Sequence, residues 1–256
     1  LLPVARAAPM RIRALFALAT LAAATAVAAP CSGTVYLTLD TGNMEPAEGI
    51  AAILDKHQVK ATFFLANEKT KRGDTSLDPS WAPFWKRMAE AGHAFGSHTW
   101  RHWYLAGDTA RGKIRYAPMG GTQGELLDEA AFCAELRKPE EAFRAMTGRG
   151  FDRIWRAPGG RITAKAVEYA KGCGFTHVGW TPAGFSGDEL PSDRFPSEQL
   201  IERQLRDIKD GDVLLWHLGI WSRQEPLWPH LDRLIAGLKA KGLCFARITD
   251  DRRWMR

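Results

Sequence analysis

The apolar positions of this chain fall into short continuous runs that alternate with amphipathic stretches. The first run, residues 34–40, is rich in β-branched and apolar residues, and residues 60–66 repeat that composition after a helical pattern at residues 50–57. Continuous apolar runs of this length are typical of strands that are buried on both faces. The start of the chain therefore predicts a strand, a helix and a second strand.

The same alternation continues towards the C-terminus. A helix over residues 78–91 is predicted because Asp78 can cap it, Pro79 suits its first turn and Gly92 ends it. Alternating strands and helices indicate a parallel sheet, and over about 220 residues the commonest closed form is a barrel. We predict an α/β fold, a distorted (β/α) barrel of about seven parallel strands, as a single domain over residues 30–256. The other predicted strands are residues 93–97, 150–156, 175–180, 212–217 and 243–248, and the other predicted helices are residues 125–147, 163–171, 197–209 and 229–241.

One segment, residues 104–124, departs from this alternation. It is rich in Gly, Arg, Lys and polar residues and has no clear periodicity, which predicts a long loop. Long loops inside compact domains are usually functional or mobile. Arg111, Lys113, Arg115 and Tyr116 are therefore candidates to line a substrate groove, and a disordered surface excursion is the alternative.

The N-terminus has the pattern of a secretory signal. Met10 and two arginines precede an Ala-rich apolar run over residues 14–29 that contains the small-residue site Ala26-Val27-Ala28. This run is short and weakly apolar for a membrane span, and Pro30 before Cys31 argues against lipid attachment. We expect residues 1–29 to be a signal peptide preceded by residues translated from a start codon set too early. Cleavage near Ala28 would give a secreted or periplasmic protein without stable membrane insertion.

Charge and cysteine content limit the partners and the compartment. The formal net charge of +6 falls to +3 when residues 1–28 are removed, which is too mild to predict a nucleic-acid partner. The four cysteines form no Cys-x-x-Cys pair, so two disulfides in an oxidising compartment are expected. Four cysteines allow three pairings. If the first and last strands are neighbours, the pairs are Cys31 with Cys244 and Cys133 with Cys173.

Two histidines four residues apart, His98 and His102, are candidate metal ligands. On a helical turn this spacing would place both rings on one side, where two imidazole nitrogens can bind a metal such as zinc. A histidine pair at this spacing is also common in ordinary surfaces and cores. Asp40, Arg156 and His217 also follow predicted strands, and the carboxyl ends of barrel strands meet at one rim. The convergence of these polar groups favours the metal site.

Together these residues suit metal-assisted hydrolysis of an amide or an ester. A metal held by the imidazoles can polarise a carbonyl group and activate a water molecule. Asp40 suits the general base, and His217 suits the acid that protonates the leaving group. Arg156 can keep the Asp40 carboxylate ionised, because a neighbouring positive charge favours the charged form.

The ordered motifs resemble the polysaccharide deacetylases of carbohydrate esterase family 4, which share the NodB homology domain. Residues 38–42 read Thr-Leu-Asp-Thr-Gly, residues 98–102 read His-Thr-Trp-Arg-His, residues 156–160 read Arg-Ala-Pro-Gly-Gly and residues 215–217 read Leu-Trp-His. The resemblance implies removal of acetyl groups from N-acetylated or O-acetylated sugars. It also implies a divalent metal, zinc first and cobalt or manganese as alternatives, with Gly159 lending a backbone N–H to the oxyanion.

Three positions depart from the family pattern. Thr41 stands where the family has its third metal ligand, an aspartate, so Asp40 itself, Asp108 or Glu45 would have to complete the shell. The aspartate expected three residues after Trp180 is absent, and Asp188 is the candidate to reach His217 in its place. Gly159 removes an aromatic wall, which predicts a groove that is wider or differently lined.

These observations predict an exported metal-dependent deacetylase. Its substrate would be an acetylated amino-sugar polysaccharide such as peptidoglycan, a chitooligosaccharide or an exopolysaccharide. Two alternatives remain open. Thr41 and Ala183 are compatible with a catalytically impaired carbohydrate-binding domain on the same barrel, and the lost aromatic wall is compatible with a hydrolase of a small non-peptide amide or ester. The sequence leaves the oligomeric state open.

Overall fold

A parallel sheet forms the centre of the molecule in the computed structural model, which describes residues 31–121 and 123–254. Every pairing within this sheet is parallel, and its main order is β10-β1-β2-β3-β7-β8, with β9 also paired to β1. The strands are β1 (Gly33–Asp40), β2 (Thr62–Leu65), β3 (Ala94–Ser97), β7 (Ile154–Trp155), β8 (Thr176–His177), β9 (Val213–His217) and β10 (Leu243–Phe245).

The segment that follows β8 closes the sheet into a distorted barrel. Phe185 forms a parallel bridge with Leu215 of β9, and the Thr181 N–H donates to the Val213 carbonyl at 3.1 Å. Because β9 pairs with β1 on its other side, the ring of strands returns to its beginning. β10 pairs only with residues 33–35 of β1 and lies beside this ring. The prediction of a distorted parallel barrel is confirmed.

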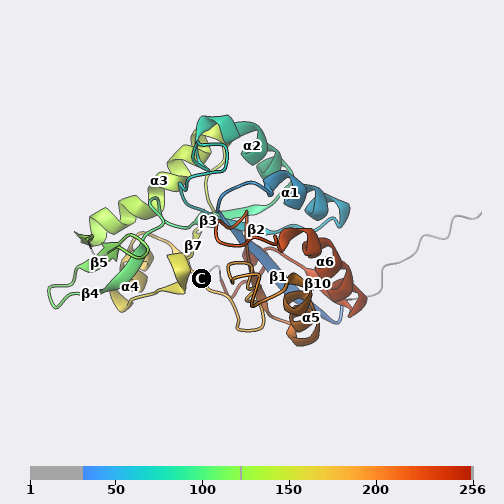
Figure 1. Ribbon diagram of the computed structural model, residues 1–256. Coiled ribbons are helices and arrows are strands. Elements are labelled where there is room, and N and C mark those ends of the chain that lie inside the picture. Colours follow the sequence, from blue (N-terminus) through green and yellow to red (C-terminus); the bar gives the residue numbers. More distant parts are fainter. Residues whose placement is uncertain (1–30, 122, 255–256) are drawn as a thin grey trace, which may run out of the picture.

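The helices cover the outside of the strands, as Figure 1 shows. Apolar side chains of α1, α2, α3, α5 and α6 pack with those of the strands into the largest buried cluster, in which the centroids of the Phe95 and Phe143 rings lie 4.5 Å apart. Asp78 caps a short 3-10 turn, Pro79–Trp81, that leads into α2, as the sequence indicates. The helices are α1 (Ala47–Lys56), α2 (Ala82–Glu90), α3 (Glu129–Thr147), α4 (Ala164–Gly172), α5 (Ser197–Asp207) and α6 (Leu231–Ala240).

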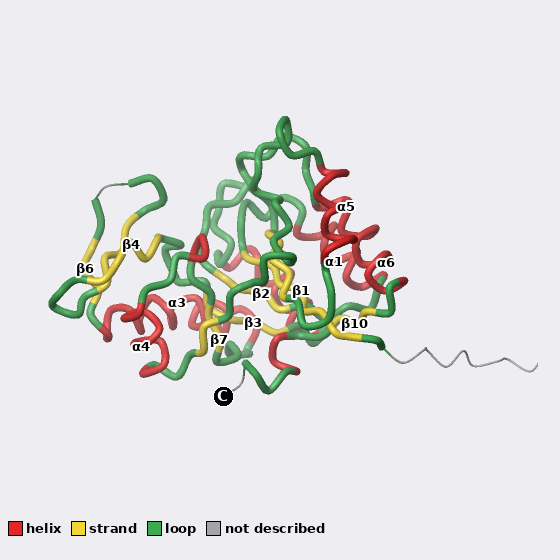
Figure 2. Tube along the Cα trace, turned by 90° about the horizontal axis from the view of Figure 1, so that it is seen from below, coloured by secondary structure: helices red, strands yellow, loops and turns green. Residues whose placement is uncertain are grey.

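The prediction of a long loop over residues 104–124 was wrong. This part of the chain forms an antiparallel sheet of β4 (Tyr104–Asp108), β5 (Ile114–Ala117) and β6 (Glu125–Leu127), which lies at the opposite end of the molecule from α5 and α6 (Figures 1 and 2). Consequently α3 begins at Glu129 and not at residue 125. Buried and exposed residues alternate in β5 over only four positions, which is too short to be recognised in the sequence.

Both predicted disulfides are present. Cys31–Cys244 joins the chain before β1 to β10, and Cys133–Cys173 joins α3 to the residue after α4. The first pair is close because β1 and β10 are neighbours, which is the condition on which the prediction depended. Within the described residues, none of the helices has the length and apolar character needed to cross a membrane. The predicted signal peptide over residues 1–29 lies outside the described residues.

Candidate active site

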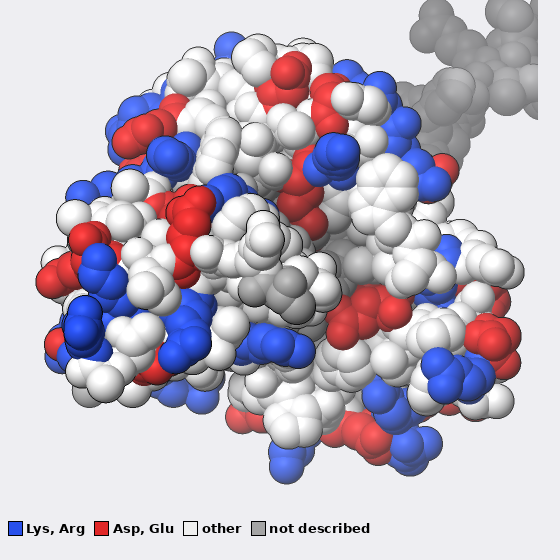
Figure 3. All heavy atoms as spheres, turned by 60° about the vertical axis from the view of Figure 1, so that its left-hand side comes forward, with Lys and Arg blue, Asp and Glu red and all other residues white. Residues whose placement is uncertain are grey.

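A groove opens at the carboxyl ends of the barrel strands, with a volume of about 730 Å³. Figure 3 shows a cleft on this side of the molecule, with acidic side chains along it. The groove is lined by the end of β1, the segment after β3 and the end of β9, because these elements point the same way in a parallel sheet. The lining residues that carry a carboxylate, an imidazole or a hydroxyl group and are discussed below are Asp40, Thr41, Glu68, His98, His102, Glu189 and His217.

Asp40 ends β1 and is held by a fully buried guanidinium. Arg156 Nη1 donates to Asp40 Oδ1 at 2.8 Å and to Thr38 Oγ1 at 2.8 Å. The other guanidinium nitrogens donate to backbone carbonyls of Val178 and Gly179. A buried ion pair of this kind needs further hydrogen bonds, and here each guanidinium nitrogen has at least one acceptor. Arg156 therefore fixes the position of the Asp40 carboxylate.

The predicted helical turn for the histidine pair was wrong. Residues 98–103 form an irregular turn after β3, in which Thr99 and His102 have φ values of 62° and 55°. This turn nevertheless brings the two rings together, with 3.1 Å between His98 Nε2 and His102 Nε2. Asp40 Oδ2 lies 3.3 Å from His98 Nε2. Burial lowers the pKa of His98 to about 4, so this ring is neutral at pH 7.

Glu68 is a site residue that sequence reasoning missed. Its Oε1 lies 3.0 Å from His102 Nδ1, and its Oε2 accepts a 2.6 Å hydrogen bond from Thr41 Oγ1. Burial raises the pKa of Glu68, but the neighbouring His102 and the hydrogen bonds outweigh burial and lower it to about 2. Glu68 comes three residues after the last residue of β2. The strand-end rule that selected Asp40 and His98 would also have selected it.

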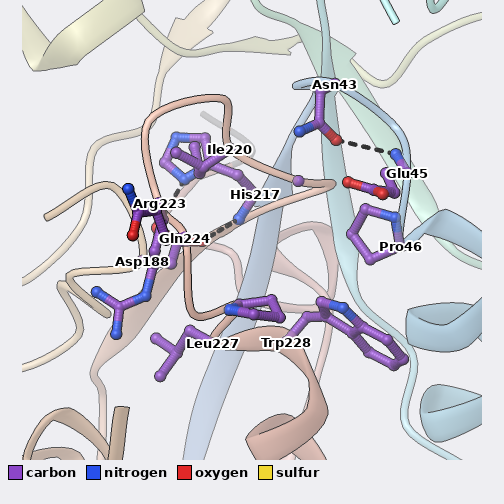
Figure 4. A pocket seen from close by; sticks show the side chains of 12 residues that line it. Asn43, Glu45, Pro46, Asp188, His217, Ile220, Arg223, Gln224, Leu227 and Trp228 are labelled. Atoms are coloured by element: carbon purple, nitrogen blue, oxygen red, sulfur yellow. Dashed lines mark hydrogen bonds and ion pairs between the residues drawn. The ribbon is translucent and has the colours of Figure 1, made fainter. Parts of the chain in front are cut away.

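The other two carboxylates proposed to complete a metal shell lie elsewhere. Asp108 belongs to β4, and its Oδ2 accepts from the Lys165 backbone N–H at 3.0 Å. Glu45 lines a second cavity of about 330 Å³, which shares His217 with the groove but does not include the histidine pair (Figure 4). Neither Asp108 nor Glu45 is therefore placed beside the histidine pair, where it could complete a metal shell.

The donors in the groove fit part of a metal shell. Ligands bound to one zinc ion at 2.0–2.1 Å in tetrahedral geometry are separated by about 3.3 Å. The separations from His98 Nε2 to His102 Nε2 and to Asp40 Oδ2, 3.1 and 3.3 Å, match that value. Within residues 31–121 and 123–254, however, no three His, Cys, Asp or Glu side chains stand as a complete metal-binding group. His98 and His102 would hold a divalent ion, with Asp40 as the nearest carboxylate.

His217 and Asp188 form the second ionisable unit of the groove. Asp188 Oδ1 lies 2.9 Å from His217 Nδ1, and its Oδ2 accepts from the His217 backbone N–H at 2.8 Å (Figure 4). Burial lowers the pKa of His217, but Asp188, Asp40 and Glu189 together raise it to about 9. The structure thus places Asp188 against His217 from the long loop before α5, and the ring carries a proton at pH 7.

The groove wall near Gly159 is rebuilt by Tyr104. Gly159 has a φ of 59°, and a Cβ atom there would lie 2.5 Å from the Tyr104 ring. A Cβ atom at Gly160 would similarly meet the Trp180 ring at 2.6 Å. Tyr104 and Trp180 both line the groove. Of the two possibilities predicted from Gly159, a wider groove or a differently lined one, this arrangement agrees with the second.

The residues of segment 104–124 that line the groove differ from those predicted. Arg111 and Lys113 line a separate surface cavity, and Arg115 is exposed. Tyr116 is fully buried, with its Oη 3.0 Å from both Thr99 Oγ1 and Glu135 Oε2. The residues of this segment that do line the groove are Tyr104, Pro118 and Met119.

Comparison with known proteins agrees with the ordered motifs. The chain is 26% identical over 215 residues to the peptidoglycan-N-acetylglucosamine deacetylase of Bacillus cereus, covering 84% of this chain and 66%, just under two thirds, of that protein. The structure of the Bc1960 peptidoglycan N-acetylglucosamine deacetylase superposes with a TM-score of 0.65 at 25% identity, covering 86% of this chain and 89% of that one.

A second solved structure is a mutant of BA3943, described as a CE4 family pseudoenzyme with restored enzymatic activity. It superposes with a TM-score of 0.63 at 25% identity and covers 85% of this chain and 66% of that chain. The family model for polysaccharide deacetylase matches residues 28–178, which is more than half of the chain. The chain therefore belongs to the polysaccharide deacetylase family, whose enzymes are hydrolases of carbon–nitrogen bonds other than peptide bonds.

Proposed function

We propose that this protein is an exported, metal-dependent deacetylase that hydrolyses N-acetyl or O-acetyl groups of an amino-sugar polysaccharide or peptidoglycan. One observation carries the proposal. The Asp40 carboxylate, held by Arg156, and the protonated His217 imidazole, held by Asp188, line the same groove, together with the histidine pair. This is the arrangement that amide hydrolysis needs, a proton acceptor and a proton donor beside an electrophilic centre.

The proposed roles follow from these contacts. Asp40 accepts the proton of the attacking water, and Arg156 keeps the carboxylate ionised and aimed. His217 gives its proton to the leaving amine or alcohol, and Asp188 holds the ring in the orientation that points Nε2 into the groove. A divalent metal, zinc, cobalt or manganese, would polarise the acetyl carbonyl when bound by His98 and His102. Gly159, which lines the groove, would lend its backbone N–H to the oxyanion.

The shape of the groove supports a sugar substrate. It is open and is walled by Trp103, Tyr104, Trp180 and Trp221, and flat rings of this kind cover the apolar faces of sugars. Export is supported by the signal-like N-terminus and by the two disulfides, which persist in oxidising compartments.

Two alternatives use the same groove. A catalytically silent carbohydrate-binding domain would explain Thr41 and Ala183, but Asp188 fills the place next to His217 that Ala183 leaves open. A hydrolase of a small amide or ester would suit a groove without its aromatic wall, but Tyr104 rebuilds that wall. Both observations favour the deacetylase.

The test measures acetate release by residues 30–256 supplied with zinc, cobalt or manganese. The substrates are peptidoglycan, chitooligosaccharides and an acetylated exopolysaccharide. The proposal expects metal-dependent release that His217→Ala abolishes while glycan binding remains. Tight glycan binding without acetate release under any metal would favour the catalytically silent carbohydrate-binding domain. Acetate release from small acetyl esters alone would favour the hydrolase of a small amide or ester.

A further inference from the structure

We infer that Glu68 is a positioning residue of the metal site: held in place by Thr41, it fixes His102 in the tautomer that presents Nε2 to the cation. The inference rests on the metal dependence proposed above and concerns Glu68, a residue that the motifs do not single out. It also gives Thr41 a function, at the position where an aspartate ligand would be expected.

The hydrogen bonds of His98 determine which of its nitrogens is free. His98 Nδ1 lies 3.0 Å from the backbone carbonyl oxygen of Arg156. A carbonyl oxygen only accepts hydrogen bonds, so Nδ1 carries the hydrogen. In the neutral ring Nε2 then has a lone pair, and it points to Asp40 Oδ2 and His102 Nε2.

Glu68 imposes the same tautomer on His102. A carboxylate oxygen also only accepts, so His102 Nδ1 donates to Glu68 Oε1 and Nε2 is the ring nitrogen left to bind a cation. The Nε2 atoms of the two rings then face each other across 3.1 Å, beside the Asp40 carboxylate, where a cation would be bound. Metal-ligating histidines are held in this way by a carboxylate or a carbonyl on the other ring nitrogen.

Thr41 holds Glu68 and is not free to act as a ligand. Its hydroxyl donates to Glu68 Oε2 at 2.6 Å and accepts from the Ala66 backbone N–H at 3.0 Å, and the residue is 1% exposed. Glu68 contacts Nδ1, the ring nitrogen on the side away from His98, so it acts through His102. The carboxylate that residue 41 does not provide is therefore present in Glu68, in contact with the outer side of a ligand ring.

The test measures the affinity of the metal-free protein for zinc and cobalt by competition with a chelating dye. Glu68→Leu, which removes the acceptor, should weaken the affinity about 10- to 100-fold. Glu68→Gln keeps an acceptor oxygen and should lose less, and Thr41→Val should fall between wild type and Glu68→Leu. Glu141→Leu, on the exposed surface of α3, is the matched control and should bind like wild type.

A second measurement separates positioning from a general structural effect. ¹⁵N spectra of the metal-free imidazoles should show His102 with its hydrogen on Nδ1 in wild type and in Glu68→Gln, and a mixture of tautomers in Glu68→Leu. His217, in the same groove, reports whether each variant is folded. Failure of wild type to bind metal would refute the proposed metal dependence. Normal affinity in Glu68→Leu, or a metal-bound structure in which Glu68 itself is a ligand, would refute the role inferred here.

Discussion

His98 and His217 lie in the same groove, are both largely buried, and have opposite protonation behaviour. The pKa of His98 is lowered to about 4, and the pKa of His217 is raised to about 9. Burial lowers the pKa of both rings, so burial does not explain the difference. Asp40 raises the pKa of both rings. The largest contribution that differs comes from the group on Nδ1, a neutral backbone carbonyl for His98 and the Asp188 carboxylate for His217, while His102 further lowers the pKa of His98 and Glu189 further raises that of His217.

This comparison shows how one residue type supplies two kinds of chemistry at one site. A ring that donates to a carbonyl stays neutral and offers a lone pair, which is what a metal requires. His217, whose ring is paired with Asp188 and lies near Asp40 and Glu189, keeps its proton, which is what a general acid requires. The groove therefore has an electron-pair donor at the end of β3 and a proton donor at the end of β9.

The largest effect should come from removing each ring in turn. His217→Gln removes the proton donor and should lower kcat on the order of 1,000-fold, within the range of general acid catalysis, while zinc affinity stays unchanged. His98→Gln should lose zinc affinity and activity together. Activity assays and dye competition would measure both, and His57→Gln, whose ring pairs with Asp232 instead, is the control. Loss of zinc affinity in His217→Gln would contradict the division of roles.

The sequence predicted much of this arrangement because the relevant rules are local. Asp40, His98 and His217 are at or next to the ends of buried apolar runs, and a parallel sheet brings such ends to one rim. The disulfide Cys31–Cys244 followed from the neighbouring first and last strands. These features depend on strand order and polarity, which the alternation of strands and helices reveals.

The features that the sequence did not reveal depend on backbone paths outside regular elements. The positive φ values at Thr99 and His102 turn the chain so that two rings meet without a helix. Tyr104 replaces the wall lost at Gly159 because β4 passes beside that glycine, and β4 was predicted as loop. Glu68 was overlooked because it belongs to none of the motifs, although it follows the end of β2 by only three residues.

The second prediction concerns the carboxylate that sets the His217 pKa. Asp188→Asn removes the charge on Nδ1, so the pKa of His217 should fall from about 9 towards its ordinary value of 6.5. The acid form is required, so activity falls as pH rises through this pKa. At pH 8 the protonated fraction would drop about 30-fold if the shift were complete.

A pH profile of kcat would measure this displacement. Asp40 and Glu189 also raise the pKa of His217 and remain in the variant, so part of the shift persists. Asp193→Asn, an exposed acid in the same loop, is the matched control. If the alkaline limb stayed near pH 9 in Asp188→Asn, Asp188 would not be the group that raises the pKa of His217 above that of His98.

The smallest effect should come from the groove wall that Tyr104 forms beside Gly159. Tyr104→Ala removes the ring that packs against Gly159 and lines the groove, so KM for a glycan should rise about 3- to 10-fold, the loss of part of one aromatic contact. Tyr104→Phe keeps the ring and should have little effect. Zinc affinity and the alkaline limb should stay as in wild type, because Tyr104 contacts neither histidine in the hydrogen bonds described. If Tyr104→Ala moved either of them, the two histidines would depend on the groove wall and not only on the groups on their Nδ1 atoms.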